Sequence, residues 1–117
     1  MKKILIADDE PNLLLLSSMI FKDAGYDVIT AVNGEEAIDK FKSEKPDLVI
    51  TDLMMPKKNG HEVIEAIRKD AKFSKTPVIL CSAVTDQMQN GEYLADDFLS
   101  KPFGVDDLKN KVKKLLG

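Results

Sequence analysis

The sequence predicts an α/β domain built around one parallel β-sheet, and two observations indicate this. Five short apolar runs alternate with five segments of helical periodicity along the 117 residues, an alternation typical of βαβ units. The run Leu48–Thr51 is almost continuously apolar or β-branched, as expected of a strand buried on both faces of a parallel sheet. Asp52 follows it, so this carboxylate is expected at the carboxyl end of a central strand.

Strands are predicted where short apolar or β-branched runs end in turn residues or carboxylates. They are Lys3–Ala7, Tyr26–Ala31, Leu48–Asp52, Val78–Cys81 and Phe98–Leu99. Helices are predicted where apolar residues recur at spacings of three and four. They are 11–24, 35–41, 61–67, 86–94 (the least regular) and a last helix from about 105. Pro11 suits the opening turn of the first helix, Gly25 suits its end, and Asn33-Gly34 suggests a turn.

Right-handed crossovers between parallel strands place helices on both faces of the sheet. The commonest doubly wound arrangement of five such strands has the order 2-1-3-4-5. We therefore predict a flavodoxin-like (βα)5 fold occupying residues 1–117 as a single domain.

Composition excludes several classes of function. The single cysteine, Cys81, cannot form a disulfide within the chain, and its apolar surroundings predict a small core residue. The apolar run Ile4–Ala7 is too short for a signal peptide or a membrane span. The net charge is −3, and positive and negative residues are interspersed along the chain, so no positive electrostatic field is expected that would bind nucleic acid. We expect a cytoplasmic protein that contacts neither membrane nor nucleic acid directly.

Polar residues follow four of the five predicted strands. They are Asp8 and Asp9, Asp52, Ser82, and Lys101. Parallel strands end at one edge of the sheet, and ligands bind beyond those ends where the strand order reverses. Two carboxylates about 4 Å apart repel by on the order of 4 kcal/mol at an effective dielectric constant of about 20. The cluster therefore predicts a cation, and Mg²⁺ fits because it combines a few carboxylates with water and phosphate oxygens.

A carboxylate can also act as a nucleophile and form an aspartyl phosphate. Phosphoryl transfer requires positioning and neutralisation of charge, which a cation, Lys101 and the Ser82 hydroxyl would supply. One aspartate at a strand end is usually a turn or cap residue. The joint occurrence at four strand ends favours a phosphoryl-transfer site.

These residues resemble the receiver domain of two-component response regulators, over essentially the whole chain. The motifs, in order, are Asp8-Asp9, Asp52 with Met55-Pro56 and Gly60, Ser82-Ala83, and Lys101-Pro102-Phe103. Each motif alone is weak, whereas the ordered set is highly specific.

The resemblance implies that Asp52 accepts a phosphoryl group from a sensor histidine kinase or histidine phosphotransfer protein. Asp9, Asp52 and the Met54 carbonyl would bind Mg²⁺ directly, with Asp8 acting mainly through water. Lys101 and Ser82 would contact the phosphoryl group, and the Lys101–Pro102 bond would be cis. Ser82 and Phe98 would form a switch that remodels the surface of the fourth helix, fifth strand and fifth helix. Apart from adding and removing its own phosphoryl group, the domain would not be an enzyme.

The sequence departs from the receiver pattern between Ser82 and Lys101, where it is about three residues shorter than most receivers. The motif residues before Asp96 are also replaced by Tyr93-Leu94-Ala95. We therefore expect the fourth helix to be short or irregular.

Other classes of function fit less well. A phosphatase of the haloacid dehalogenase type needs a second aspartate where this chain has Met54. A nucleotide or flavin module needs a glycine-rich loop, whereas Asp8–Pro11 is acidic and lacks glycine. A pseudo-receiver that binds partners without phosphorylation remains the alternative. The downstream partner is expected to be an effector protein or a covalently linked output domain.

Overall fold

The computed structural model describes residues 2–82, 95–100 and 104–116, and it contains one five-stranded sheet. Adjacent strands are parallel, in the order β2-β1-β3-β4-β5, which confirms the predicted flavodoxin-like fold. The strands are β1 (Lys3–Ala7), β2 (Asp27–Ala31), β3 (Leu48–Asp52), β4 (Val78–Ser82) and β5 (Asp97–Ser100).

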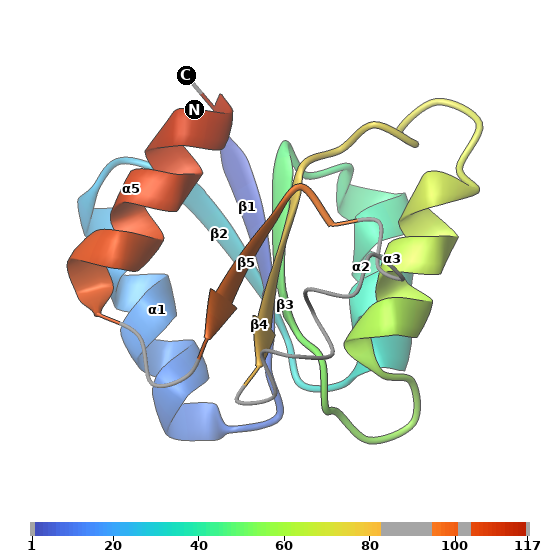
Figure 1. The fold of residues 1–117 in the computed structure, drawn as a ribbon, viewed down its shortest axis with the longest axis horizontal. Helices are drawn as coiled ribbons and strands as arrows, with labels where there is room; N and C mark the ends of the chain where they lie inside the picture. The colour runs from blue at the N-terminus through green and yellow to red at the C-terminus, as the bar shows by residue number, and fades with distance from the viewer. Residues whose placement is uncertain (1, 83–94, 101–103, 117) are drawn as a thin grey trace.

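Helices cover both faces of the sheet, with α1 and α5 on one face and α2 and α3 on the other (Figure 1). They are α1 (Pro11–Asp23), α2 (Gly34–Glu44), α3 (Gly60–Arg68) and α5 (Val105–Leu116). Among the described segments, no helix is long and apolar enough to cross a membrane. The predicted helix 86–94, with the shortening expected there, lies outside the described residues.

Alternation along each strand sends side chains into two apolar layers. Leu5 and Val49 belong to the layer under α2 and α3, whereas Ile4 and Ile50 belong to the layer under α1 and α5. Every residue of β3 is buried, because the strand has neighbours on both sides and helices on both faces. Cys81 is 3% exposed in the second layer, as predicted for a small core residue.

Local chemistry sets the ends of the helices. The Glu36 N–H donates to the Asn33 side chain at 2.7 Å, so the predicted Asn33-Gly34 turn is in fact the start of α2. Asn is a preferred residue at this capping position because its oxygen satisfies a free helical N–H. The end of α1 is fixed by Gly25, whose φ of +95° suits a residue without Cβ. Tyr26 then packs edge-on against Phe21.

Arg68 ties the end of α3 to the segments before β4 and β5. Its guanidinium donates to the carbonyls of Ser74 and Thr76 at 2.9 and 2.7 Å and to the Asp96 carboxylate at 2.8 Å. The same Asp96 oxygen accepts the Val78 N–H at 2.8 Å. These bonds lie at the edge of the sheet where strands begin, away from the carboxylate cluster.

We expect Arg68→Met to lower the free energy of unfolding by about 1–3 kcal/mol, because it removes charge-assisted hydrogen bonds from a side chain that is only 18% exposed. The matched control is Lys69→Met, whose side chain is 79% exposed and whose effect should stay within about 0.5 kcal/mol. Urea denaturation followed by circular dichroism measures both. Equal stability of the two variants would contradict the prediction.

Candidate functional site

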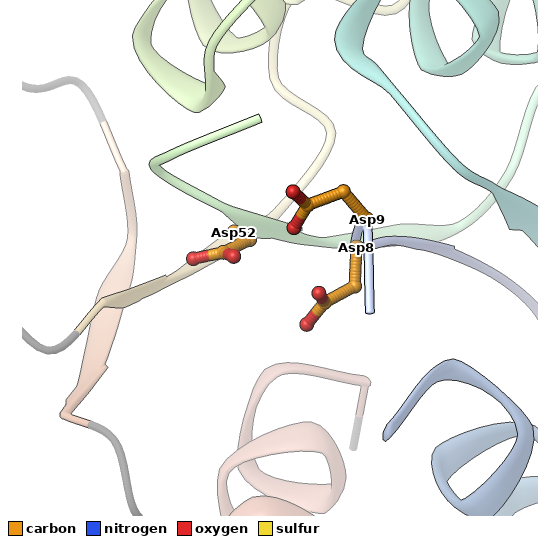
Figure 2. Close-up of side chains that lie close together, drawn as sticks. All are labelled: Asp8, Asp9 and Asp52. Carbon is orange, nitrogen blue, oxygen red and sulfur yellow. The ribbon is translucent and has the colours of Figure 1, made fainter. Parts of the chain in front are cut away.

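The pairing of β1 with β3 brings three aspartates together. Ala7 pairs with Thr51, so Asp8 and Asp52, the next residues of the two strands, are neighbours. Asp9 follows in the loop after β1. Carboxylate oxygens of Asp8, Asp9 and Asp52 all lie within 4.8 Å of one another. Figure 2 shows the three side chains around a shared space at the carboxyl end of the sheet.

Two of the three carboxylates are buried, which strengthens the repulsion between their negative charges. Asp8 and Asp52 are 6% and 8% exposed, whereas Asp9 is exposed. Two unit charges 4.8 Å apart repel by about 3.5 kcal/mol at an effective dielectric constant of about 20. Three oxygen donors with partly desolvated negative charge match the preference of a hard divalent cation such as Mg²⁺. The described residues therefore fit the predicted metal.

Asp8 also has a structural role. Its Oδ1 accepts the Glu10 N–H at 2.9 Å, and its own N–H donates to the Ala31 carbonyl at 3.1 Å. The first bond supports the start of α1, where the Glu10 side chain makes no capping hydrogen bond. Asp8 thus joins β1, the end of β2 and the beginning of α1 while directing a carboxylate oxygen into the cluster.

The loop after Asp52 is held against the neighbouring strand. The Leu53 N–H donates to the Cys81 carbonyl at 2.9 Å, and the Gly60 N–H donates to the Leu53 carbonyl at 2.8 Å. The Met54 side chain is 65% exposed, while Met55 packs partly buried against the core. Met54 therefore contributes little to packing, and its carbonyl as a metal ligand stays a prediction.

The remaining predicted site residues lie partly outside the described structure. Ser82 ends β4, next to the strand that carries Asp52, but its side chain is not among those described. Lys101 and the Lys101–Pro102 bond also lie outside the described residues. Phe98 is half-buried and packs against the layer under α2 and α3. Its role in a switch stays a prediction.

Sequence reasoning missed the contact between the first turn of α2 and the loop after Asp52. A Cβ on Gly34 would lie 2.5 Å from the Lys58 carbonyl carbon, so the two segments touch through backbone. The only signal in the sequence was a glycine where the structure begins a helix. The adjacent Lys57 has a φ of +68°, which its residue type does not suggest.

Comparison with protein families identifies this arrangement. The family model of the response regulator receiver domain matches residues 4–113. The chain belongs to the response regulator receiver family. Receiver domains are signalling modules rather than metabolic enzymes, and they generally use Mg²⁺ at an acidic pocket. The cluster of three aspartates in this chain agrees with that use.

Curated relatives of this receiver domain are transcriptional regulators. PhoP of Bacillus subtilis, an alkaline phosphatase synthesis regulator, is 39% identical over 98% of the chain and 48% of its own length. RpaA of Synechocystis is 38% identical over 99% of the chain and 49% of its length. The chain therefore spans about half the length of the curated relatives that it matches.

Solved structures match over nearly the whole chain. CheY4 of Vibrio cholerae, a chemotaxis response regulator, has a TM-score of 0.91 at 31% identity, covering 98% of each chain. TrrA of Thermotoga maritima, solved in complex with Mg²⁺ and beryllium fluoride, has a TM-score of 0.87 at 44% identity, covering 98% of this chain and 99% of that one.

We expect Asp9→Asn to stabilise the receiver domain without metal, on the order of 1 kcal/mol, because it removes one of three repelling charges. The same change should reduce the stabilisation that Mg²⁺ provides by binding the folded state. Thermal unfolding with and without Mg²⁺ measures both effects. Asp39→Asn, an exposed substitution on α2, is the control. An Asp9→Asn variant that keeps the full Mg²⁺ response would contradict the prediction.

Proposed function

We propose that Asp52 accepts a phosphoryl group from a sensor histidine kinase or a histidine phosphotransfer protein. The convergence of Asp8, Asp9 and Asp52 within 4.8 Å is the observation that carries this proposal. Of the three aspartates, only Asp52 is the last residue of β3, the middle strand of the sheet. Every residue of that strand is buried, so the position of Asp52 is fixed by the core. The relative TrrA, with its bound Mg²⁺ and beryllium fluoride, supports the same chemistry here.

In the proposed reaction a carboxylate oxygen of Asp52 attacks the phosphorus atom of a phosphohistidine. A phosphorus–oxygen bond forms, the phosphorus–nitrogen bond breaks, and the released imidazole takes a proton from solvent. Asp8, Asp9, Asp52 and the Met54 carbonyl would hold Mg²⁺, which would neutralise charge on the phosphoryl oxygens. Lys101 and the Ser82 hydroxyl would contact those oxygens from the other strand ends.

Phosphorylation adds negative charge and acceptor oxygens at one edge of the sheet. In our proposal these draw Ser82 and Lys101 toward Asp52 and allow Phe98 to change its packing. The surface near β5 and α5 is then the output surface. The target would be an effector protein or, as in the longer transcriptional regulators that match this chain, a linked output domain.

Incubation with acetyl phosphate and Mg²⁺ should add one phosphoryl group to the wild type, detected by intact mass. Asp52→Asn should add none, because an amide nitrogen cannot replace the carboxylate nucleophile, and omission of Mg²⁺ should abolish the adduct. Asp39→Asn should behave like the wild type.

An adduct that persists in Asp52→Asn would overturn the assignment of the phosphoacceptor. If the wild type formed no adduct and also failed to bind beryllium fluoride, the pseudo-receiver function would be favoured instead. The partner search would then use the unphosphorylated protein.

A protein phosphodonor needs a surface beside the site, and α1 offers one. It begins shortly after Asp9, and Leu15, Leu16 and Met19 are 62%, 51% and 55% exposed. Exposed apolar side chains close to a polar site are typical of a protein contact. We propose that the phosphohistidine donor protein packs against this part of α1.

We expect Leu16→Lys to slow phosphoryl transfer from a phosphorylated histidine protein by about tenfold, the effect of one interface residue worth about 1.4 kcal/mol. Its reaction with acetyl phosphate, which needs no docking surface, should be unchanged. Asp23→Ser, at the far end of α1, is the control. Equal slowing with both donors would show damage to the site rather than loss of docking.

A further inference from the structure

The first residue of α2 packs directly against the loop that follows Asp52. A Cβ on Gly34 would overlap the Lys58 carbonyl oxygen and lie 2.5 Å from its carbon and 2.8 Å from the Lys58 Cβ. Non-bonded carbon and oxygen atoms approach to about 3.3 Å at closest. Any side chain at position 34 must therefore displace backbone.

The helix cannot yield easily, because α2 is anchored. Asn33 accepts the Glu36 N–H at 2.7 Å, and Ala37 and Phe41 are 0% and 1% exposed in the core. A substitution at Gly34 should therefore move the loop rather than the helix.

The loop has an unusual conformation where α2 touches it. The Lys58 N–H donates to the Pro56 carbonyl at 2.8 Å, which closes a three-residue turn around Lys57. The φ of Lys57 is +68°, near the value of the rare and strained γ-turn. Such backbone persists only where the surrounding structure enforces it. The Lys58 side chain forms an exposed ion pair with Glu62 at 3.7 Å, whereas the backbone of the turn is approached most closely by Gly34.

The other end of the loop is equally tight. A Cβ on Gly60 would overlap the Asp52 carbonyl oxygen and lie 2.8 Å from the Leu53 Cα. The segment from Leu53 to Gly60 is thus held between α2 on one side and the backbone of Asp52 on the other. A shift of Lys58 would be passed along this short backbone segment toward Met54 and Asp52, because its far end is fixed by the close contact of Gly60 with Asp52.

We propose that Gly34 is a positioning residue for the site at Asp52. By allowing α2 to press against the Lys58 carbonyl, it holds the loop in the strained turn that sets the geometry of the carboxylate cluster. The inference concerns cation binding directly, and its extension to phosphoryl transfer rests on the proposed function.

The test is Gly34→Ala, compared with Gly104→Ala, where the added Cβ would meet its nearest atom at an ordinary 3.7 Å. Mg²⁺ affinity is measured by calorimetry, and the rate of phosphorylation by acetyl phosphate is measured by intact mass. Gly34→Ala should weaken Mg²⁺ binding and slow phosphorylation by about tenfold each, as is typical when support for metal ligands is lost. Gly104→Ala should change neither.

A second control separates positioning from stability. Arg68→Met is expected to destabilise the fold at the opposite edge of the sheet, so it should lower stability without changing Mg²⁺ affinity or rate. Both variants are measured well below their unfolding temperatures. If Gly34→Ala loses stability but keeps wild-type Mg²⁺ affinity, its role is structural only and the proposal is wrong.

A measurement on the wild type covers the case in which Gly34→Ala does not fold. In an NMR titration with Mg²⁺, the amides of Gly34 and Lys58 should shift with the same dissociation constant as Asp52, whereas that of Gly104 should not. Unshifted Gly34 and Lys58 amides would overturn the proposal. If the wild type binds Mg²⁺ but is never phosphorylated, only the proposed function fails, and the Mg²⁺ measurements still decide the role of Gly34.

Discussion

The parallel pairing of β1 with β3 is the interaction on which the rest of the structure depends. Because Ala7 pairs with Thr51, Asp8 and Asp52 leave the sheet side by side. Burial of β3 on both faces makes this register costly to shift, since a slip by one residue would turn every apolar side chain to the wrong layer. The same apolar packing that stabilises the fold therefore also sets the separation of the carboxylates.

The carboxylate cluster destabilises the fold that brings its three side chains together. Removing Asp8 and Asp52 from water and placing them near Asp9 costs free energy, which the two apolar layers offset. Because the cluster already costs free energy, any charge added beside these aspartates should change the stability of the domain. The cluster is therefore suited both to holding a cation and to responding to a phosphoryl group.

Much of the fold could be predicted from the sequence because its signals are local. The run ending at Asp52 and the glycine at the end of α1 specify their own conformations. The cluster of aspartates followed from topology, since parallel strands share an edge. The contact of Gly34 with Lys58 could not be predicted, because the start of a helix there meets a loop that is distant in sequence. The turn at Lys57 could not be predicted either, because tertiary packing there overrides the preference of a lysine for negative φ.

Both ends of the described chain lie at the edge of the sheet opposite the carboxylates (Figure 1). A fluorescent protein or affinity handle fused at either end would thus leave the aspartates accessible to a small phosphodonor. Any influence of the site on a fused module would have to travel the length of the sheet or of α5. The domain is therefore suited to engineered fusions in which the carboxylate site lies at one edge of the sheet and the fused reporter lies at the opposite edge.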